Sequence, residues 1–586
     1  MKKILFLALS AITILAGCDL ERFPYDAYAS EEVQSDPESK ADVLLNGCYS
    51  YIRAVEETTV RLGEYRGDHV RKDKPTTAAY RIFYLFDRVP DNTEVDNYWK
   101  NCYKIISQSS EIIKMIPEGQ SDEIDQQIGE AYFLRGWMYW NLSKMFGRPY
   151  YQDPEKNLAV PIVNGIPEDL KEYELPDRST VKDVYEFAIK DLEKAENLLN
   201  TFSPIKASKE ATWAILSKIY AHMSGTFENP NTTYAQLSLN YADKVIKSGQ
   251  FNLLDRKTFM SSNEMAPDNA AHTEVIFACK LRFEDRPKAG DQAGLLGGQY
   301  ARIKEIGWGE TGVSSIAIDL LNEVETNDWR KGPGNTEGII DARAAWVVPD
   351  YSKDANGDLK RAFIFVANQY DASGTHNGFN TLTFDKESVN NDDQLLTVKD
   401  PSDGTIYNLT PVDVKNRKYS ISYKGNTYVG YDDARMSENQ SHPNYYNYKL
   451  SMEGGGNFGV QTHSIRVATL SDIHLLRAEA NAKLGNYGEA LTDLNLIRER
   501  SLPGHGYESL NAGNAGDLIL KERALEMMFT GNRVFDLFRN GRTLQRAFPG
   551  WQTDPLRVIQ PTDNDIVMYI PTQQIQAWRG TLTQNP

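Results

Sequence analysis

The sequence predicts a mainly α protein: a helical repeat scaffold of paired helices, with an inserted loop-rich subdomain that contains minor β structure. Two observations support this prediction. In several long segments apolar residues recur every three or four positions, which is the period of an α-helix. Residues 260–460 are instead rich in Gly, Asn, Asp and Ser, and their apolar runs are short. Short apolar runs between turn-forming residues are typical of strands.

Helices are expected throughout the first part of the chain. They cover residues 39–52, 98–116, 122–146, 180–200, 208–222 and 234–248. Between the first two of these helices, residues 63–97 combine turn-forming residues with many charges and are predicted as a loop. Consecutive antiparallel helices bury their apolar faces on one another, which is typical of a helical repeat array.

The clearest helix pair is expected near the C-terminus, over residues 470–484 and 487–500. The residues at the junction, Gly485, Tyr487 and Ala490, have the spacing Gly-x-Tyr-x-x-Ala of the centre of a tetratricopeptide repeat. In that repeat Gly ends the first helix, Tyr lies between the helices and Ala permits their close crossing.

Short strands are expected within residues 260–460. Residues 275–278 and 363–367 are apolar runs, and residues 419–423 and 427–429 flank a turn-like Lys424-Gly425-Asn426 and predict a hairpin. Because no Pro- or Ser-rich linker separates this region, we expect it to pack against the helices.

The N-terminus has the pattern of an export signal. Met1-Lys2-Lys3 is cationic, residues 4–15 are almost wholly apolar, and small residues lead to Cys18. An apolar run of about a dozen residues is too short to span a bilayer, which needs roughly 20. Leu15-Ala16-Gly17-Cys18 resembles the bacterial lipobox, so residues 1–17 are predicted as a signal peptide and 18–36 as a tether lipidated at Cys18. A plain exported protein with an incidental Cys18 is the alternative.

Composition excludes some partners. The chain has 64 Lys and Arg against 81 Asp and Glu, a formal net charge of −17. An acidic surface repels phosphate backbones, so a nucleic acid is not expected as a partner. Aromatic residues make up 11% of the chain, which is compatible with sugar or peptide recognition but also with ordinary cores.

Cysteine and histidine patterns predict neither a metal site nor thiol catalysis. Besides Cys18 the chain has Cys48, Cys102 and Cys279, without CxxC spacing, and its eight His form no HExxH motif. The three cysteines are expected to be buried apolar residues, with a Cys48–Cys102 disulfide as the alternative. Asp354-x-Asn356-x-Asp358 resembles the start of a calcium loop but lacks its bidentate Glu, so a solvated turn is the favoured interpretation and a structural calcium ion is unsupported.

Four motifs, taken in order, resemble one known family. They are Gly129-Glu130-Ala131-x-Phe133-Leu134-Arg135, Leu475-Leu476-x-Ala478-Glu479-Ala480, Gly531-Asn532-Arg533-x-Phe535-Asp536-Leu537-x-Arg539, and Tyr569-Ile570-Pro571 with the terminal Leu582-Thr583-Gln584-Asn585-Pro586. Behind the Cys18 motif, they resemble the SusD/RagB outer-membrane lipoproteins of Bacteroidetes.

This resemblance implies four tetratricopeptide-like helix pairs that support an irregular subdomain. The helical regions then cover residues 37–259 and 461–586, and the subdomain covers 260–460. It implies a cell-surface, lipid-anchored protein of the outer membrane, without catalytic activity or cofactor. Such a protein captures oligosaccharides for a SusC-like TonB-dependent transporter.

Alternatives to glycan capture remain open. Within the family, one branch captures peptides or glycopeptides. A surface glycan hydrolase needs two carboxyl groups roughly 5–10 Å apart across a cleft, and no acidic pair in the sequence stands out for that role. An assembly scaffold is a further alternative, because tetratricopeptide repeats usually bind proteins. The charged residues Glu522, Arg523, Glu526, Arg533, Asp536 and Arg539 are predicted to form an ion-pair network rather than an acid–base pair.

Candidate ligand contacts are expected where aromatic and polar side chains share an exposed loop. Aromatic faces hold the C–H side of a neutral sugar, and amides, carboxylates or guanidinium groups bind its hydroxyls. The first candidate region, before Trp99, contains Tyr80, Arg81, Tyr84 and Asn92.

The second candidate region lies at residues 297–310 and contains Tyr300, Arg302 and Trp308. Trp308 is expected to be exposed, because the flanking Gly307 and Gly309 give it little cover. In the family, corresponding loops contribute to ligand binding, and these residues match by location only.

Overall fold

The computed structural model describes most of the chain after the predicted tether. The described residues are 37–72, 80–163, 175–262, 265–281, 296, 309, 311–329, 336–350, 352, 354–356, 360–435, 443–447, 449, 463–548 and 557–586. No helix in these ranges is both long enough and apolar enough to span a bilayer. The predicted signal peptide and Cys18 lie outside them.

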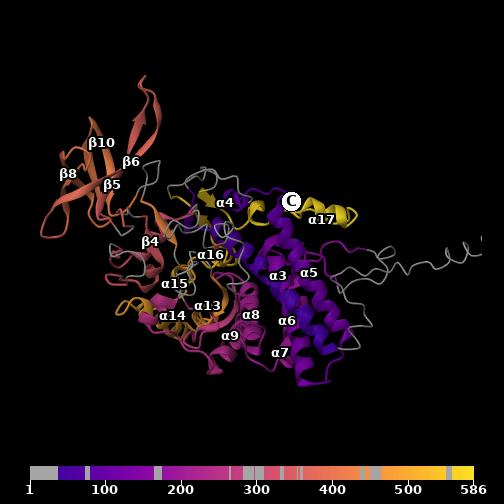
Figure 1. Ribbon diagram of the computed structural model, residues 1–586. Coiled ribbons are helices and arrows are strands. Elements are labelled where there is room, and N and C mark those ends of the chain that lie inside the picture. The colour runs from indigo at the N-terminus through magenta and orange to yellow at the C-terminus, as the bar shows by residue number, and fades with distance from the viewer. Residues whose placement is uncertain are drawn as a thin grey trace, which may run out of the picture.

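The expected mainly α architecture is confirmed. The N-terminal helices are α3 (Pro37–Arg66), α4 (Arg81–Leu85), α5 (Thr93–Met115), α6 (Asp122–Phe146), α7 (Val181–Leu198), α8 (Lys209–Met223) and α9 (Thr232–Lys247). Consecutive long helices pack on one another, α5 on α6, α6 on α7 and α8 on α9, so that they stand side by side as a repeat array (Figure 1).

Side-chain caps determine where several of these helices begin. The hydroxyl oxygens of Ser121, Thr180 and Ser208 each accept a hydrogen bond, at 3.1 Å, from the backbone N–H three residues later. Such caps satisfy an N–H group that the helix itself leaves unpaired. The sequence pattern therefore placed the starts of α6, α7 and α8 within one or two residues.

The C-terminal helices pack against the same array. They are α13 (Leu470–Lys483), α14 (Tyr487–Ser501), α15 (Ala515–Glu526), α16 (Arg533–Arg539) and α17 (Thr572–Ala577). The predicted α13–α14 hairpin is confirmed: Gly485 adopts a φ of 82°, which favours glycine, and Ala490 is fully buried against α13. α13 also packs on α9 and α15, which joins the two halves of the chain.

The prediction of a loop over residues 63–97 is wrong in part. α3 continues to Arg66, α4 forms within the segment, and α5 already begins at Thr93. Several of the charges that suggested a solvated loop lie inside the protein: Glu64, Arg66 and Arg71 are at most 2% exposed. Sequence composition does not distinguish charges that are exposed from charges that are buried with partners.

Six strands of the inserted region close into a barrel. They are β5 (Ala362–Tyr370), β6 (His376–Val389), β7 (Leu395–Lys399), β8 (Ile406–Asp413), β9 (Lys418–Tyr423) and β10 (Asn426–Asp432), ordered β10-β5-β6-β7-β8-β9. Alternate side chains, among them Phe363, Phe365 and Phe384, fill the barrel core. The predicted β9–β10 hairpin is confirmed, whereas its closure with β5–β8 was not predicted. The barrel projects from the helical body (Figure 1).

Shorter elements connect the barrel with the helices. The two-stranded sheets join β1 (Val70–Arg71) to β3 (Gly312–Val313), β4 (Val347–Pro349) to β11 (Tyr445–Asn447), β2 (Val275–Cys279) to β12 (Ile465–Thr469), and β13 (Leu544–Gln545) to β14 (Val558–Ile559). Short helices are α10 (Arg256–Ser261), α12 (Ser315–Leu321), η3 (Ala342–Trp346) and η5 (Asn564–Ile566). The expected packing of the inserted region on the helices is thus observed.

The structure confirms that the three described cysteines are buried, as expected from the sequence. Cys48, Cys102 and Cys279 are buried and unpaired. The alternative of a Cys48–Cys102 disulfide is therefore wrong. Burial raises the pKa of the Cys48 thiol to about 12, which is unfavourable for thiolate chemistry.

A buried ion-pair network occupies the centre of the helical body, as predicted for the charged motif. Arg539 of α16 binds Glu479 of α13 through Nη2–Oε2 at 2.6 Å and Asp536 at 2.7 Å. Arg523 of α15 bridges Asp536 at 2.9 Å and Asp472 at 3.0 Å. Each partner is at most 5% exposed. The network therefore ties three C-terminal helices together without contact with bulk water.

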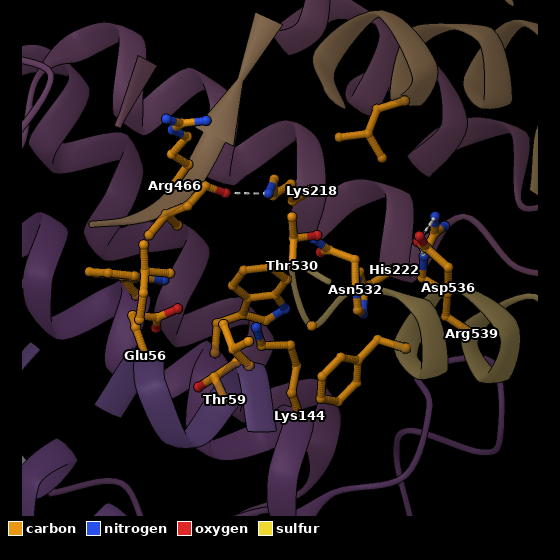
Figure 2. Close-up of a pocket in the computed structure, with 18 of the residues that line it drawn as sticks. Glu56, Thr59, Lys144, Lys218, His222, Arg466, Thr530, Asn532, Asp536 and Arg539 are labelled. Carbon is orange, nitrogen blue, oxygen red and sulfur yellow. Dashed lines mark hydrogen bonds and ion pairs between the residues drawn. The ribbon is translucent and has the colours of Figure 1, made fainter. Parts of the chain in front are cut away.

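A small cavity adjoins this network (Figure 2). Lys144, Lys218 and His222 extend into it from the N-terminal helices, opposite Asp536 and Arg539. Its volume is about 50 Å³. This exceeds the roughly 10–15 Å³ that a single water needs, but is far below the roughly 300–1,000 Å³ of ligand pockets. The cavity therefore suits water and not a nutrient.

We predict that Glu479→Gln destabilises the fold strongly. Burial alone opposes the charge of Glu479, but Arg539 and Lys483 outweigh it and hold the pKa of this carboxyl well below its usual range. Losing that charge strands the buried Arg539, which typically costs about 3–5 kcal/mol. Urea unfolding measures the free energy. The control is Glu155→Gln, whose pair with Lys182 is largely exposed and should have little effect. Equal stability of the two variants would contradict the prediction.

Candidate functional site

A two-stranded ribbon joins two stretches of chain that adjoin, in sequence, the segments predicted as ligand loops. β1 pairs antiparallel with β3, with Val70 opposite Val313 and Arg71 opposite Gly312. Residues 80–92 follow β1 after a short connection, and residues 297–310 end just before β3. The ribbon therefore pairs the strand that precedes the first segment with the strand that follows the second.

The Arg71 side chain fastens this ribbon to the rest of the body. Its guanidinium donates to the carbonyl oxygens of Val313 at 3.2 Å and Pro443 at 3.4 Å, and to Oδ1 of Asn444 at 2.5 Å. The side chain is only 1% exposed. Because a buried guanidinium requires acceptors for its N–H groups, Arg71 holds β1, β3 and the chain before β11 in one arrangement.

An open pocket of about 180 Å³ lies beside the ribbon, between the helical body and the base of the barrel. We call it the barrel-base pocket. Its lining residues are Val313, Ser315, Ile318, Asp319, Asp413, Asn416, Lys418, Tyr431, Pro443 and Tyr445. On the body side α12 is placed by Ser314, whose hydroxyl accepts a hydrogen bond from the N–H of Ala317 at 3.2 Å. On the barrel side Lys415 donates to the carbonyl of Asn322 at 3.1 Å and fixes the barrel against α12.

The polar groups of the barrel-base pocket are varied. Asp413 accepts from the backbone N–H of Asn416 at 3.1 Å and from its side-chain amide at 2.8 Å, which orders the β8–β9 turn. The ammonium of Lys418 lies 6.0 Å from the ring centroid of Tyr431. Two carboxylates, an amide, an ammonium and two tyrosine rings therefore line one open space, a set that binds hydroxyl groups and ring C–H groups.

Burial and neighbouring charges shift the pKa values of two side chains in this pocket. Burial, with a smaller contribution from Asp413, raises the pKa of Tyr431 to about 12, so its hydroxyl is protonated at neutral pH. Burial also raises the pKa of the Asp319 carboxyl; Lys415 opposes this shift and Asp413 reinforces it. The pocket thus holds both hydrogen-bond donors and acceptors for a neutral ligand.

The structure corrects the prediction that Tyr84 and Asn92 are exposed. Tyr84 lies inside α4, is fully buried, and has the guanidinium of Arg546 4.4 Å from its ring centroid. Asn92 is the N-cap of α5 and accepts from the N–H groups of Glu94 at 3.0 Å and Val95 at 3.1 Å. Both side chains therefore serve the fold, because helix formation in this segment turned them inward.

Tyr80 and Arg81 lie at the start of α4. Tyr80 is half-buried: its hydroxyl donates to Glu94 Oε2 at 2.8 Å, and Arg61 lies 4.1 Å from its ring centroid. Arg81 is exposed. The structure thus does not bring Tyr80, Tyr84 and Asn92 together as one exposed platform, and Arg81 is the member of this group that solvent reaches most freely.

Other predicted positions lie outside the described residues. They are Tyr300, Arg302, Trp308, Cys18 and Asp358. Within the described ranges, no group of three or more His, Cys, Asp or Glu is arranged to hold a metal ion.

Sequence reasoning missed Asp319, Lys418 and Tyr431. Lys418 and Tyr431 face each other across the predicted β9–β10 hairpin. Their alternation with the inward-facing Tyr419 and Ile421 was a signal that Lys418 points outward. What it faces depends on how the barrel sits on α12, which no local pattern encodes.

Family comparisons agree with this architecture. A family model described as "SusD family" matches residues 273–586. A second, described as "Starch-binding associating with outer membrane", matches residues 20–221. The chain belongs to the SusD family.

Individual SusD relatives share the fold over nearly their full length. SusD-like protein P38 of Formosa agariphila is 23% identical over 93% of this chain and 92% of that protein. A solved SusD superfamily protein from Bacteroides thetaiotaomicron superposes with a TM-score of 0.67 at 22% identity, covering 94% of this chain and 99% of the other. A structure from Bacteroides vulgatus described as a putative sugar binding protein gives a TM-score of 0.65 at 19% identity, covering 94% and 98% of the two chains.

We predict that Arg71→Leu loosens the ribbon beside the pocket. It leaves the acceptors at Val313, Pro443 and Asn444 without their charged donor, and such hydrogen bonds contribute about 1.5–3 kcal/mol each at most. Amide hydrogen exchange should become faster in residues 311–315 and 443–447. Arg542→Leu is the control, because its side chain is 33% exposed and pairs at the surface. Unchanged exchange in Arg71→Leu would contradict the role assigned to this side chain.

Proposed function

We propose that this SusD-family protein is a non-catalytic, cell-surface lipoprotein of the outer membrane that captures oligosaccharides and delivers them to a SusC-like TonB-dependent transporter. The observation that best supports ligand capture is the barrel-base pocket, where Tyr431, Tyr445, Asp319, Asn416 and Lys418 surround one open space beside the ribbon. The family descriptions supply the association with starch and with the outer membrane.

The dimensions of the pocket favour one unit of a longer ligand. Its volume of about 180 Å³ is smaller than the roughly 300–1,000 Å³ of pockets that enclose whole small molecules. An open pocket of this size holds part of a chain while the remainder extends across the surface. Trp308, Tyr300 and Arg302 are proposed as further contacts, because their segment ends just before β3 at the pocket rim.

The mixed charge of the pocket suits hydroxyl groups better than a uniformly charged ligand. Lys418 donates, whereas Asp319 and Asp413 accept, so a sugar with several hydroxyls satisfies both kinds of group. Catalysis is not part of the proposal, because capture requires no bond cleavage and the family description that names an activity names starch binding.

We predict that Asp319→Asn and Lys418→Met each weaken glycan binding about tenfold, which corresponds to roughly 1.4 kcal/mol. Residues 19–586 are first applied to a glycan array and a peptide array, and calorimetry with the bound compound then gives the affinities. Lys182→Met, on an exposed face of α7, is the control. The melting temperature should stay near that of the parent, since Asp319 is exposed and Lys418 is half-buried.

Two results would contradict non-catalytic glycan capture, and a third would contradict the barrel-base pocket as its site. Binding to peptides alone would establish the peptide alternative. Shortening of the bound glycan by the purified protein would establish a hydrolase. Equal affinity of both pocket variants and the parent would place the ligand elsewhere on the protein.

A separate prediction concerns the anchor and the transporter. Cys18→Ala should release the protein from membranes, because buried acyl chains contribute about 0.8 kcal/mol per methylene. Gentle detergent extraction of the natural form should co-isolate a large TonB-dependent barrel through an interface on the order of 1,200–2,000 Å². Retention of Cys18→Ala on outer membranes at high salt would contradict lipid anchoring. Recovery of the natural form alone would contradict delivery to a transporter.

A further inference from the structure

The β5–β6 hairpin extends beyond the closed part of the barrel. β6 is 14 residues long, but β7 pairs with it only from Asp385 to Val389. Beyond this point only β5 and β6 pair with each other, with Asn368 opposite Phe379 and Tyr370 opposite His376. Figure 1 shows this outer part of the β5–β6 hairpin projecting away from the helical body. The outer hairpin contributes little to the barrel core and is free to contact a ligand.

Three aromatic side chains form one patch on the outer part of the β5–β6 hairpin. The ring of His376 lies 5.8 Å from that of Tyr370 and 4.9 Å from that of Phe379, edge-on to both. Tyr370 is 50% exposed and Phe379 is 42% exposed. We call these residues the hairpin patch. Large rings left in water on a projecting element indicate a contact surface, because apolar exposure is unfavourable unless a ligand covers it.

Local hydrogen bonds order the hairpin patch before any ligand arrives. At the tip, the carboxylate of Asp371 accepts from the N–H groups of Ser373 at 2.8 Å and Thr375 at 2.9 Å. Asn368 donates to the hydroxyl of Tyr370 at 3.4 Å on the same face. A preorganised surface loses less conformational entropy on binding, so even a small patch of this kind contributes useful affinity.

The composition around the rings selects the class of ligand. Residues 368–380 include no Lys or Arg. Asn368 lies on the face of the rings, because it pairs with Phe379 and donates to Tyr370, whereas Gln369 and Asn380 alternate to the opposite face. The absence of cations disfavours anionic ligands and membrane surfaces, which attract basic residues. Three rings are also too small an area for a stable protein interface of roughly 1,200 Å² or more. Ring faces carry negative partial charge and suit the C–H groups of a sugar, and amides suit its hydroxyls.

We propose that the hairpin patch is a second carbohydrate-binding site, distinct from the barrel-base pocket, that binds a neutral polysaccharide chain. The proposal rests on the glycan-capture function argued above. Two sites on one protein let a polymer bind at both, and the second contact is then intramolecular. Polymers, and not short oligosaccharides, gain affinity from the patch.

The test compares polymer and short oligosaccharide binding by residues 19–586 carrying Tyr370→Ala and Phe379→Ala together. The probes are the neutral polysaccharide that gives the strongest array signal and its trisaccharide. Retention of the variant on the immobilised polymer should fall about tenfold or more, whereas trisaccharide affinity should stay unchanged. Tyr370→Phe, which keeps the ring, should retain polymer binding. Ile406→Ala is the control, because Ile406 is a 54% exposed apolar residue elsewhere on the barrel.

Each outcome decides between the two proposals. Unchanged polymer retention in the double variant, with loss of trisaccharide binding in Asp319→Asn, overturns the second site and leaves the pocket in place. Loss of polymer retention in the double variant alone supports the second site. Patch-dependent binding to phosphatidylcholine vesicles, without a change in polymer retention, overturns it in favour of a membrane contact. If the parent protein binds no glycan on the array, both proposals fail.

Discussion

The buried ion-pair network is the constraint on which the rest of the structure depends. Arg539, Arg523 and their carboxylates connect α13, α15 and α16, and Arg533 extends the connections to Asp68 at the end of α3, at 2.8 Å. A buried charge without its partner is strongly unfavourable, so these helices assemble together or not at all. Hydrophobic burial alone would permit small shifts between helices, whereas paired guanidinium and carboxylate groups fix their relative positions.

Rigidity at the centre matters because the candidate site is assembled from distant segments. Asp68 lies two residues before the start of β1, and Arg71 of β1 then fixes β3 and the chain before β11. The barrel is held to the same frame through Lys415, which donates to the carbonyl oxygen of Asn322 at the end of α12 at 3.1 Å. The pocket between α12 and the barrel thus keeps its shape through contacts that do not themselves touch a ligand.

The barrel gives this protein a second kind of surface. Of the 13 exposed large hydrophobic side chains in the described ranges, seven lie between Tyr370 and Val414, on the barrel or its connecting turns. On the long helices of the described ranges, by contrast, the exposed large apolar side chains are Val43 and Leu496 alone. This division suits a protein whose helices serve as scaffold and whose inserted region meets the ligand, as loops and insertions commonly do.

The sequence by itself determined most of the long helices and the family. Apolar periodicity and caps such as Ser121 and Ser208 placed α6 and α8, since these signals act within a few residues. It also predicted the β9–β10 hairpin, because a turn between alternating strands is a local feature. Only the tertiary structure decided that Tyr84 is buried, that six strands close into a barrel, and that Tyr431 faces α12. Those facts depend on contacts between residues far apart in the chain, which no local pattern of residues encodes.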